Sequence, residues 1–226
     1  MSDSSRAIGV VSVAALMTPQ LKFEGIHLLS TTRPDSFNPY LGAIRGYLIQ
    51  MIKSDAEKNE LFLQPISYTV VYCPADGTIL VYTRSSDPAN YEEDRLMGLV
   101  SIGVGGHYEL NDLWSSDPIR ANLCRELKEE IHLTIPVDEK NIHLIGMIMD
   151  RSNEVGRVHF GLLSVVSVLP GDIKHFSQEF ARGRMIKLDE ILNYMNQPNV
   201  QPENWTVLGL PIFLRWLQGG IKHQWI

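Results

Sequence analysis

Apolar residues recur at every fourth position near the middle of the chain, at Ile119, Leu123, Leu127 and Ile131. This spacing places one apolar stripe along an amphipathic helix. Asp117 followed by Pro118 is a strong start signal, because aspartate caps helix N-termini and proline is favoured at the first helical position. His132 follows the stripe and tolerates the left-handed conformation that often ends a helix. The pattern therefore predicts a helix over residues 118–131.

Strand-like and helical segments follow one another irregularly along the rest of the chain. β-Branched runs at residues 66–73 and 79–84 flank Pro74-Ala75-Asp76-Gly77, which is a hairpin signal. Strands are also expected at 23–30, 142–149, 158–169 and 96–104, the last entering a glycine turn, and helices at 39–53 and 211–218. Residues 7–17 suit a buried strand or an ordered arm, and residues 185–192 suit a strand passing into a helix. Without regular βαβ alternation, this order predicts a mixed sheet covered by helices.

The length of the chain, 226 residues, is enough for one substantial core. We interpret residues 61–226 as the main domain and residues 1–60 as an N-terminal extension that packs on it. The hydrophobic share of 44% and the charged share of 20% are ordinary for a globular protein.

The net charge of −6 argues against binding to bulk nucleic acid, whose phosphate backbone attracts an excess of lysine and arginine. The net charge does not argue against a small phosphorylated ligand, because a metal ion offsets the charge of such a ligand locally. Cys73 and Cys124 are too few for a disulfide framework and fit a reducing compartment. The apolar run at 7–17 is too short for a membrane span, so we expect a cytoplasmic protein with no membrane partner.

The predicted helix carries three carboxylates, Glu126, Glu129 and Glu130, at positions i, i+3 and i+4. They fall within a sector of about 100° and point the same way. Like charges this close repel one another, so a solvated helix gains nothing from the arrangement. A divalent cation makes the clustering favourable, because carboxylate oxygens are the ligands of Mg²⁺. Mg²⁺ usually binds substrate phosphates as well.

These residues resemble the signature of the Nudix hydrolase family, which is Gly, five residues, Glu, seven residues, then Arg-Glu-apolar-x-Glu-Glu-x-Gly-apolar. The resemblance covers residues 106–133, but its glycine half and helix half lie five residues too far apart. The lone Glu of the family falls on Asp112 when counted from Gly106 and on Asp117 when counted from Arg125. We prefer Asp117, because a rigid helix fixes spacing better than a loop, although this residue is as well explained as the helix cap. His132 stands where the family has its last glycine.

The resemblance implies an α/β/α sandwich with a mixed sheet, and hydrolysis of a nucleoside diphosphate linked to another group with Mg²⁺ or Mn²⁺. By the same position-by-position match, Glu126, Glu129 and Glu130 are implied as metal ligands and Gly105 as the donor of a backbone carbonyl near the metal. Arg125 is implied to orient the carboxylates by bidentate hydrogen bonding. The implied partner is a small nucleotide, and a homodimer is expected because oligomers are common in the family.

The general base and the substrate contacts rest on weaker signals. Glu154 and Glu179 are the candidates for the base, with a solvated loop acid as the alternative for each. Trp114 is a candidate for stacking on a base, since such stacking is worth about 1–3 kcal/mol, with a cover over the helix start as the alternative. Candidates for phosphate contacts are His107, Arg84, Arg95 and Arg157, whereas His159 is interpreted as a core histidine.

Two other functions compete with hydrolysis. The five-residue insertion, the Asp in place of Glu and His132 fit a non-catalytic nucleotide-binding or regulatory module that kept the fold. A prenyl diphosphate isomerase shares the fold but needs an active-site cysteine, for which Cys73 is the candidate. The isomerase hypothesis is the weaker of the two, because Cys73 lacks the expected surroundings.

Overall fold

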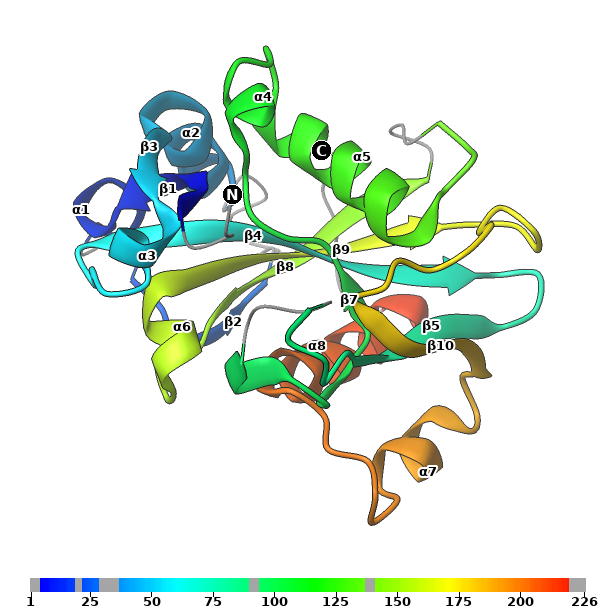
Figure 1. Cartoon of the computed structure of the whole chain (residues 1–226). Coiled ribbons are helices and arrows are strands. Elements are labelled where there is room, and N and C mark those ends of the chain that lie inside the picture. Colours follow the sequence, from blue (N-terminus) through cyan, green and yellow to red (C-terminus); the bar gives the residue numbers. More distant parts are fainter. Residues whose placement is uncertain (1–4, 19–21, 29–36, 90–93, 137–140, 220–226) are drawn as a thin grey trace.

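The computed structural model describes residues 5–18, 22–28, 37–89, 94–136 and 141–219. Its central sheet has the strand order β10-β5-β4-β9-β8-β2 (Figure 1). The strands are β2 (Gly25–His27), β4 (Phe62–Cys73), β5 (Thr78–Arg84), β8 (Ile142–Met149), β9 (His159–Ser167) and β10 (Phe180–Lys187). β4 and β9 are parallel and the other neighbours along this path are antiparallel, so the predicted mixed sheet is confirmed.

One helix covers each face of this sheet (Figure 1). Helix α5 (Pro118–Ile131) packs Leu123 and Leu127 against Val71 and Val166. Helix α8 (Asn204–Leu217) packs on the opposite face, where its buried side chains lie in one cluster with Val70 and Val165. Adjacent strand residues point to opposite faces, so these neighbouring valines divide between two cores. The α/β/α sandwich is confirmed.

The N-terminal elements lie beside one end of the sheet (Figure 1). They are β1 (Ala7–Ser12), α1 (Val13–Leu16), α2 (Asn38–Tyr47), β3 (Ile49–Ile52) and α3 (Lys53–Ala56). β1 pairs with β3 and, at its end, with β4, while β2 extends the sheet beyond β8. The boundary between an extension of residues 1–60 and a domain of residues 61–226 stays a prediction.

The helix predicted over 39–53 is wrong beyond Tyr47. Leu48 takes an extended conformation, with φ −66° and ψ 122°, and the chain continues as β3. Leu48 and Ile52 continue the helical spacing of Leu41 and Ile44, but pairing of Ala7 with Ile52 and of Val10 with Ile49 draws residues 49–52 into a strand. Tertiary pairing has overridden a local pattern.

Two other boundaries differ from the sequence prediction. The expected strand at 96–104 is broken into a 3-10 turn, η2 (Asp94–Leu96), and two short strands, β6 (Val100–Ser101) and β7 (Gly103–Val104), which pair with β5 and β4 respectively. The last helix begins at Asn204 and holds Pro211 in its interior. Pro211 has no backbone N–H to donate to the carbonyl of Val207, a residue that is 55% exposed.

Three short helices complete the described part of the chain: α4 (Leu110–Leu113), α6 (Glu154–Val158) and α7 (Ile191–Met195). Within the described ranges, no helix combines the length and apolar character that a membrane crossing requires. The expected homodimer and cytoplasmic location stay predictions.

Candidate active site

A cavity of about 710 Å³ lies between α5, the glycine turn, α6 and the start of α8. One wall carries the carboxylates Glu126, Glu129, Glu130 and Glu179. Arg125 lies on the same wall, and the lining also carries four other cationic side chains, from Arg6, Lys53, Arg84 and Arg95. A concave site that combines clustered acids with surrounding cations is suited to a ligand with both phosphate groups and bound metal ions.

The ends of α5 hold its carboxylates in place. Asp117 caps the helix by accepting from the backbone N–H of Arg120 at 3.4 Å, and His132 ends it in the left-handed conformation with φ 47°, as predicted. The apolar stripe faces the sheet and is buried. Glu126 and Glu130 therefore lie in the cavity wall, 8% and 6% exposed, while the Glu129 side chain remains 58% exposed at its edge.

The double glycine allows the preceding turn to approach this helix closely. Gly105 has φ +140°, and a Cβ there would lie 2.1 Å from the carbonyl oxygen of Ser67. Its backbone N–H donates to Glu130 Oε2 at 3.1 Å. A Cβ on Gly106 would lie 2.8 Å from Glu126 Oε1. The glycines thus bring backbone polar groups to the two buried carboxylates.

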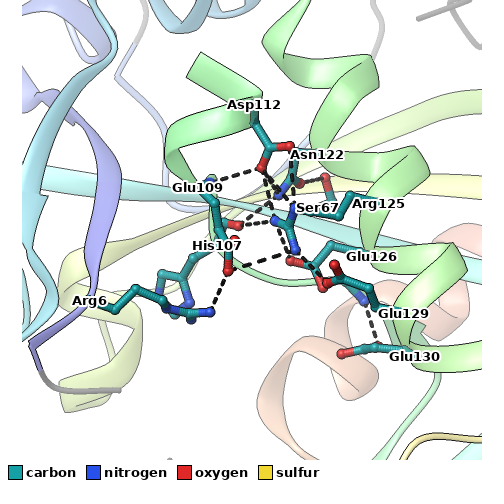
Figure 2. A network of polar contacts seen from close by, with 11 residues as sticks. Arg6, Ser67, His107, Glu109, Asp112, Asn122, Arg125, Glu126, Glu129 and Glu130 are labelled. Carbon is teal, nitrogen blue, oxygen red and sulfur yellow. Dashed lines mark hydrogen bonds and ion pairs between the residues drawn. The ribbon is translucent and has the colours of Figure 1, made fainter. Parts of the chain in front are cut away.

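Arg125 joins the acids of the site (Figure 2). Its Nη2 lies 2.9 Å from both Asp112 Oδ2 and Glu126 Oε1, and its Nη1 donates to Glu129 Oε2 at 2.8 Å. Nη2 also donates to the backbone oxygen of His107 at 2.8 Å, which ties the glycine turn to α5. The expected orienting role of Arg125 fits these contacts.

The preference for Asp117 over Asp112 is wrong as regards contact with Arg125. Asp117 pairs with Arg45 at 3.1 Å, away from the cavity. Asp112 is 2% exposed and accepts from Arg125 and from the backbone N–H of Glu109. The reason is that the inserted residues fold into α4, which turns Asp112 back toward the main helix. Counting back along the rigid helix α5 pointed to Asp117, but the short helix α4 inside the insertion brings Asp112 to Arg125 instead.

Asn122 is a site residue that the sequence analysis missed. It is fully buried on α5, one turn before Glu126. Its amide donates to the backbone oxygen of His107 at 2.8 Å, and its carbonyl accepts from Ser67 Oγ (Figure 2). A lone asparagine in a helix gives no sequence signal of this kind, because its role depends on the turn packed against it.

Burial and mutual repulsion disfavour the charged forms of the two buried acids. Loss of hydration, opposed by Arg125, raises the pKa of Glu126 to about 7. Burial, together with the charges of Glu126 and Glu179, raises the pKa of Glu130 well above its usual range. Arg84 and the N–H of Gly105 oppose that rise only in part. Two such carboxylates side by side fit a divalent cation, which would offset both charges and take oxygen ligands.

The predicted base and substrate residues fall into two groups. Glu154, Glu179, Arg84, Arg95, His107 and also His159 line the cavity. Trp114 does not: it follows α4 on the surface and is 73% exposed, which leaves its proposed stacking role without support. Arg157 is likewise outside the lining and pairs with Glu60 at 3.0 Å.

Other lining residues were not anticipated. Trp205, at the start of α8, is the tryptophan that the structure places in the cavity wall. Glu203 is 4% exposed and accepts from Arg84 Nε at 2.8 Å and from the hydroxyl of Tyr68 at 2.8 Å. It therefore holds Arg84 at the cavity. Both residues precede the predicted start of the last helix, and that misplaced boundary concealed them.

Cys73 lies elsewhere, at the end of β4. It is buried, its Sγ is 3.7 Å from Asp76 Oδ2, and neither cysteine is among the residues that line the cavity. The active-site cysteine that the isomerase hypothesis requires is therefore missing from this lining.

No family model matches the chain. The Bacillus subtilis (strain 168) protein YmaB is 32% identical over 174 residues, which make up 76% of this chain and 80% of YmaB. The crystal structure of Tm1382, of the Nudix family, has a TM-score of 0.69 at 24% identity and covers 93% of this chain and 100% of its own. The Nudix domain of Shewanella oneidensis NrtR, solved with ADP ribose, has a TM-score of 0.50 at 13% identity and covers 69% and 88%.

The likeness to the solved structures agrees with the fold described above. By its fold and by its relatedness to YmaB, the chain belongs to the Nudix hydrolase family.

Proposed function

We propose that the protein hydrolyses a phosphoanhydride bond in a nucleoside diphosphate linked to a second group, with Mg²⁺ or Mn²⁺. The observation that supports this most is the Arg125 network, which holds Glu126 and Glu129 in one cavity wall next to Glu130. The wall contains every charged residue of the helix half of the family signature. The proposal of hydrolysis thus rests on these charged side chains as well as on the fold.

A phosphoanhydride resists water because its oxygens repel a nucleophile and the departing phosphate gains charge. Glu126, Glu129 and Glu130 would hold the cation, with the carbonyl of Gly105 beside them. When bound, the cation neutralises phosphate charge and activates water. Arg125 keeps the carboxylates oriented, since it contacts Glu126 and Glu129 at once. Arg84, anchored by Glu203, presents a fixed positive charge toward phosphate oxygens.

The general base is assigned to Glu179, ahead of Glu154. Two observations support this choice: Glu179 lines the cavity directly before β10, and its charge raises the pKa of both Glu126 and Glu130. Glu154 begins α6 and also lines the cavity. A base must reach the attacking water near the cation, and Glu179 is the acid better placed for that.

The substrate class follows from the size and composition of the cavity. A volume of about 710 Å³ falls within the range of pockets that enclose whole small ligands. Arg84, Arg95 and Lys53 offer positive charge for a diphosphate, while Trp205 offers a face for a base or a sugar. NrtR, a protein of the same fold, holds ADP ribose in its Nudix domain. Nucleoside diphosphate sugars are therefore the first compounds to test.

The test is a substrate panel with Mg²⁺ or Mn²⁺, containing nucleoside diphosphate sugars, dinucleotides and nucleoside triphosphates. Cleavage of a diphosphate linkage yields two phosphomonoesters, which release phosphate only after phosphatase treatment. Free phosphate, free pyrophosphate and phosphatase-released phosphate are therefore measured separately. We expect phosphatase-dependent phosphate from at least one linked diphosphate and none in EDTA. Tight binding by calorimetry without product across the panel would instead support the non-catalytic module.

A further inference from the structure

We infer that Glu57, His107 and His159 form a second metal site, separate from the acidic helix, for a borderline divalent ion such as Zn²⁺. The three ligand atoms lie within 4.8 Å of one another. They come from three parts of the chain: the end of α3, the residue after the double glycine and the first residue of β9. His107 lies in the variable spacer of the Nudix signature and the other two lie outside it, so none is a specified position of the signature and the inference stands apart from the proposed hydrolysis.

The spacing of the ligand atoms fits tetrahedral coordination. His107 Nε2 and His159 Nε2 are 3.3 Å apart, and His159 Nε2 is 3.5 Å from Glu57 Oε1. Zinc binds histidine nitrogen at about 2.0–2.1 Å, so tetrahedral angles set neighbouring ligands about 3.3–3.4 Å apart. Octahedral Mg²⁺ at the same bond length would require adjacent ligands about 2.9 Å apart. These two separations match the tetrahedral arrangement, and the third, between His107 and Glu57, lies within 4.8 Å.

Hydrogen bonding determines which atoms of the cluster carry lone pairs. His159 Nδ1 lies 2.6 Å from the carbonyl oxygen of Val155, which only accepts, so Nδ1 carries the hydrogen. In a neutral His159, Nε2 then has a lone pair, which faces His107 Nε2 at 3.3 Å and is the atom available to a metal ion. A metal ion would take this lone pair together with the oxygen of Glu57, which is 3.5 Å away.

The same hydrogen bonds position the ligands. A histidine that binds metal through one nitrogen usually donates its other N–H to a carbonyl or carboxylate, as His159 does to Val155. Gln64 donates to Glu57 Oε1 at 3.1 Å, and its own carbonyl is 2.7 Å from His107 Nε2. Glu57 Oε2 also pairs with Arg95. Glu57 and His159 are thus each held by a second residue that fixes its direction, whereas His107 Nε2 donates to Gln64 in the metal-free protein and must release that hydrogen to bind a metal.

The composition of the site selects the metal. Two imidazoles and one carboxylate suit zinc and other late first-row ions, whereas Mg²⁺ prefers oxygen ligands throughout. Both histidines line the cavity, so a fourth ligand position facing it would accept water or a phosphate oxygen of the substrate. A metal here would also join α3 to the sheet.

The direct test is calorimetric titration of metal-free full-length protein with Zn²⁺ alone, with excess Mg²⁺ present to occupy the acidic helix. We expect one Zn²⁺ per chain, with affinity lowered at least about 100-fold in Glu57→Gln and His159→Gln, because loss of a ligand should exceed the loss on removing a supporting residue. Co²⁺ at the same site should give the intense visible absorption of tetrahedral nitrogen and oxygen coordination. Circular dichroism verifies that each variant is folded.

Two control variants make the result specific. His175→Gln removes a member of the other histidine pair, whose rings stack 3.4 Å apart, and should leave Zn²⁺ affinity unchanged. Glu130→Gln alters the acidic helix and should also leave it unchanged. Zinc affinity that survives in folded His159→Gln, or that is lost in His175→Gln or Glu130→Gln, would overturn the proposal. Loss of hydrolysis with zinc binding intact would instead count only against the proposed function.

Discussion

Glu130→Gln is expected to lower turnover at least about 100-fold while the protein remains folded. Glu130 is 6% exposed, accepts from Gly105 and faces Glu126 and Glu179, so the change removes one charge from the proposed cation site with little loss of shape. Weakening residues that only support metal ligands costs about 10–100-fold, and a ligand itself should cost more. The measurement is initial rate against Mg²⁺ concentration, using the best substrate from the panel.

Variants on and beside the same helix serve as controls. Lys128→Gln changes an exposed neighbour and should retain the parental rate. Asp112→Asn should lower the rate because Asp112 holds Arg125, whereas Asp117→Ala should lower stability by about 1 kcal/mol through loss of the helix cap and leave the rate unchanged. A parental rate for Glu130→Gln at all Mg²⁺ concentrations would contradict the assigned site.

The metal-free protein is expected to lose stability as pH rises from 7 to 8.5. Folding raises the pKa of Glu126 to about 7 and raises that of Glu130 well above its usual range, so the folded state binds more protons than the unfolded chain in this window. A carboxyl with a raised pKa contributes its stability below the unfolded pKa and loses it as pH passes the folded value. The slope is up to about 1.4 kcal/mol per pH unit for each proton released.

Urea unfolding in EDTA at several pH values measures this slope. The window avoids His107, whose pKa is lowered by burial and whose linkage has the opposite sign at lower pH. The double variant Glu126→Gln with Glu130→Gln should flatten the slope and stabilise the metal-free protein at pH 8.5. Excess Mg²⁺ should restore the parental protein and leave the double variant unchanged. An equal slope in both proteins would show that these acids are not the titrating groups.

Local signals in the sequence were enough to predict the acidic helix. Asp117, Pro118 and His132 marked both ends, and the apolar stripe set the direction of the carboxylates, so α5 runs over residues 118–131 as expected. The strand 142–149 and the hairpin around Gly77 were also predictable, because β-branched runs and a turn act within a few residues. The resemblance to the family then supplied the chemistry.

Contacts between distant segments were not predictable in this way. Asp112 reaches Arg125 only because the insertion forms α4, and β3 replaces helix only because β1 lies beside it. His159 was predicted to be a core histidine, and it is buried. Its position next to His107 and Glu57, however, depends on the packing of β9 against two other segments. Such groupings are properties of the fold, and one sequence does not display them.

The central claim is that the short acidic helix anchors divalent cations beside the substrate. The most direct measurement is anomalous diffraction at the manganese edge from crystals soaked in Mn²⁺. The account predicts an anomalous peak bonded to carboxylate oxygens of Glu126, Glu129 or Glu130, and loss of that peak in Glu126→Gln with Glu130→Gln. Crystals that hydrolyse a nucleotide substrate yet show no manganese at these side chains would contradict it.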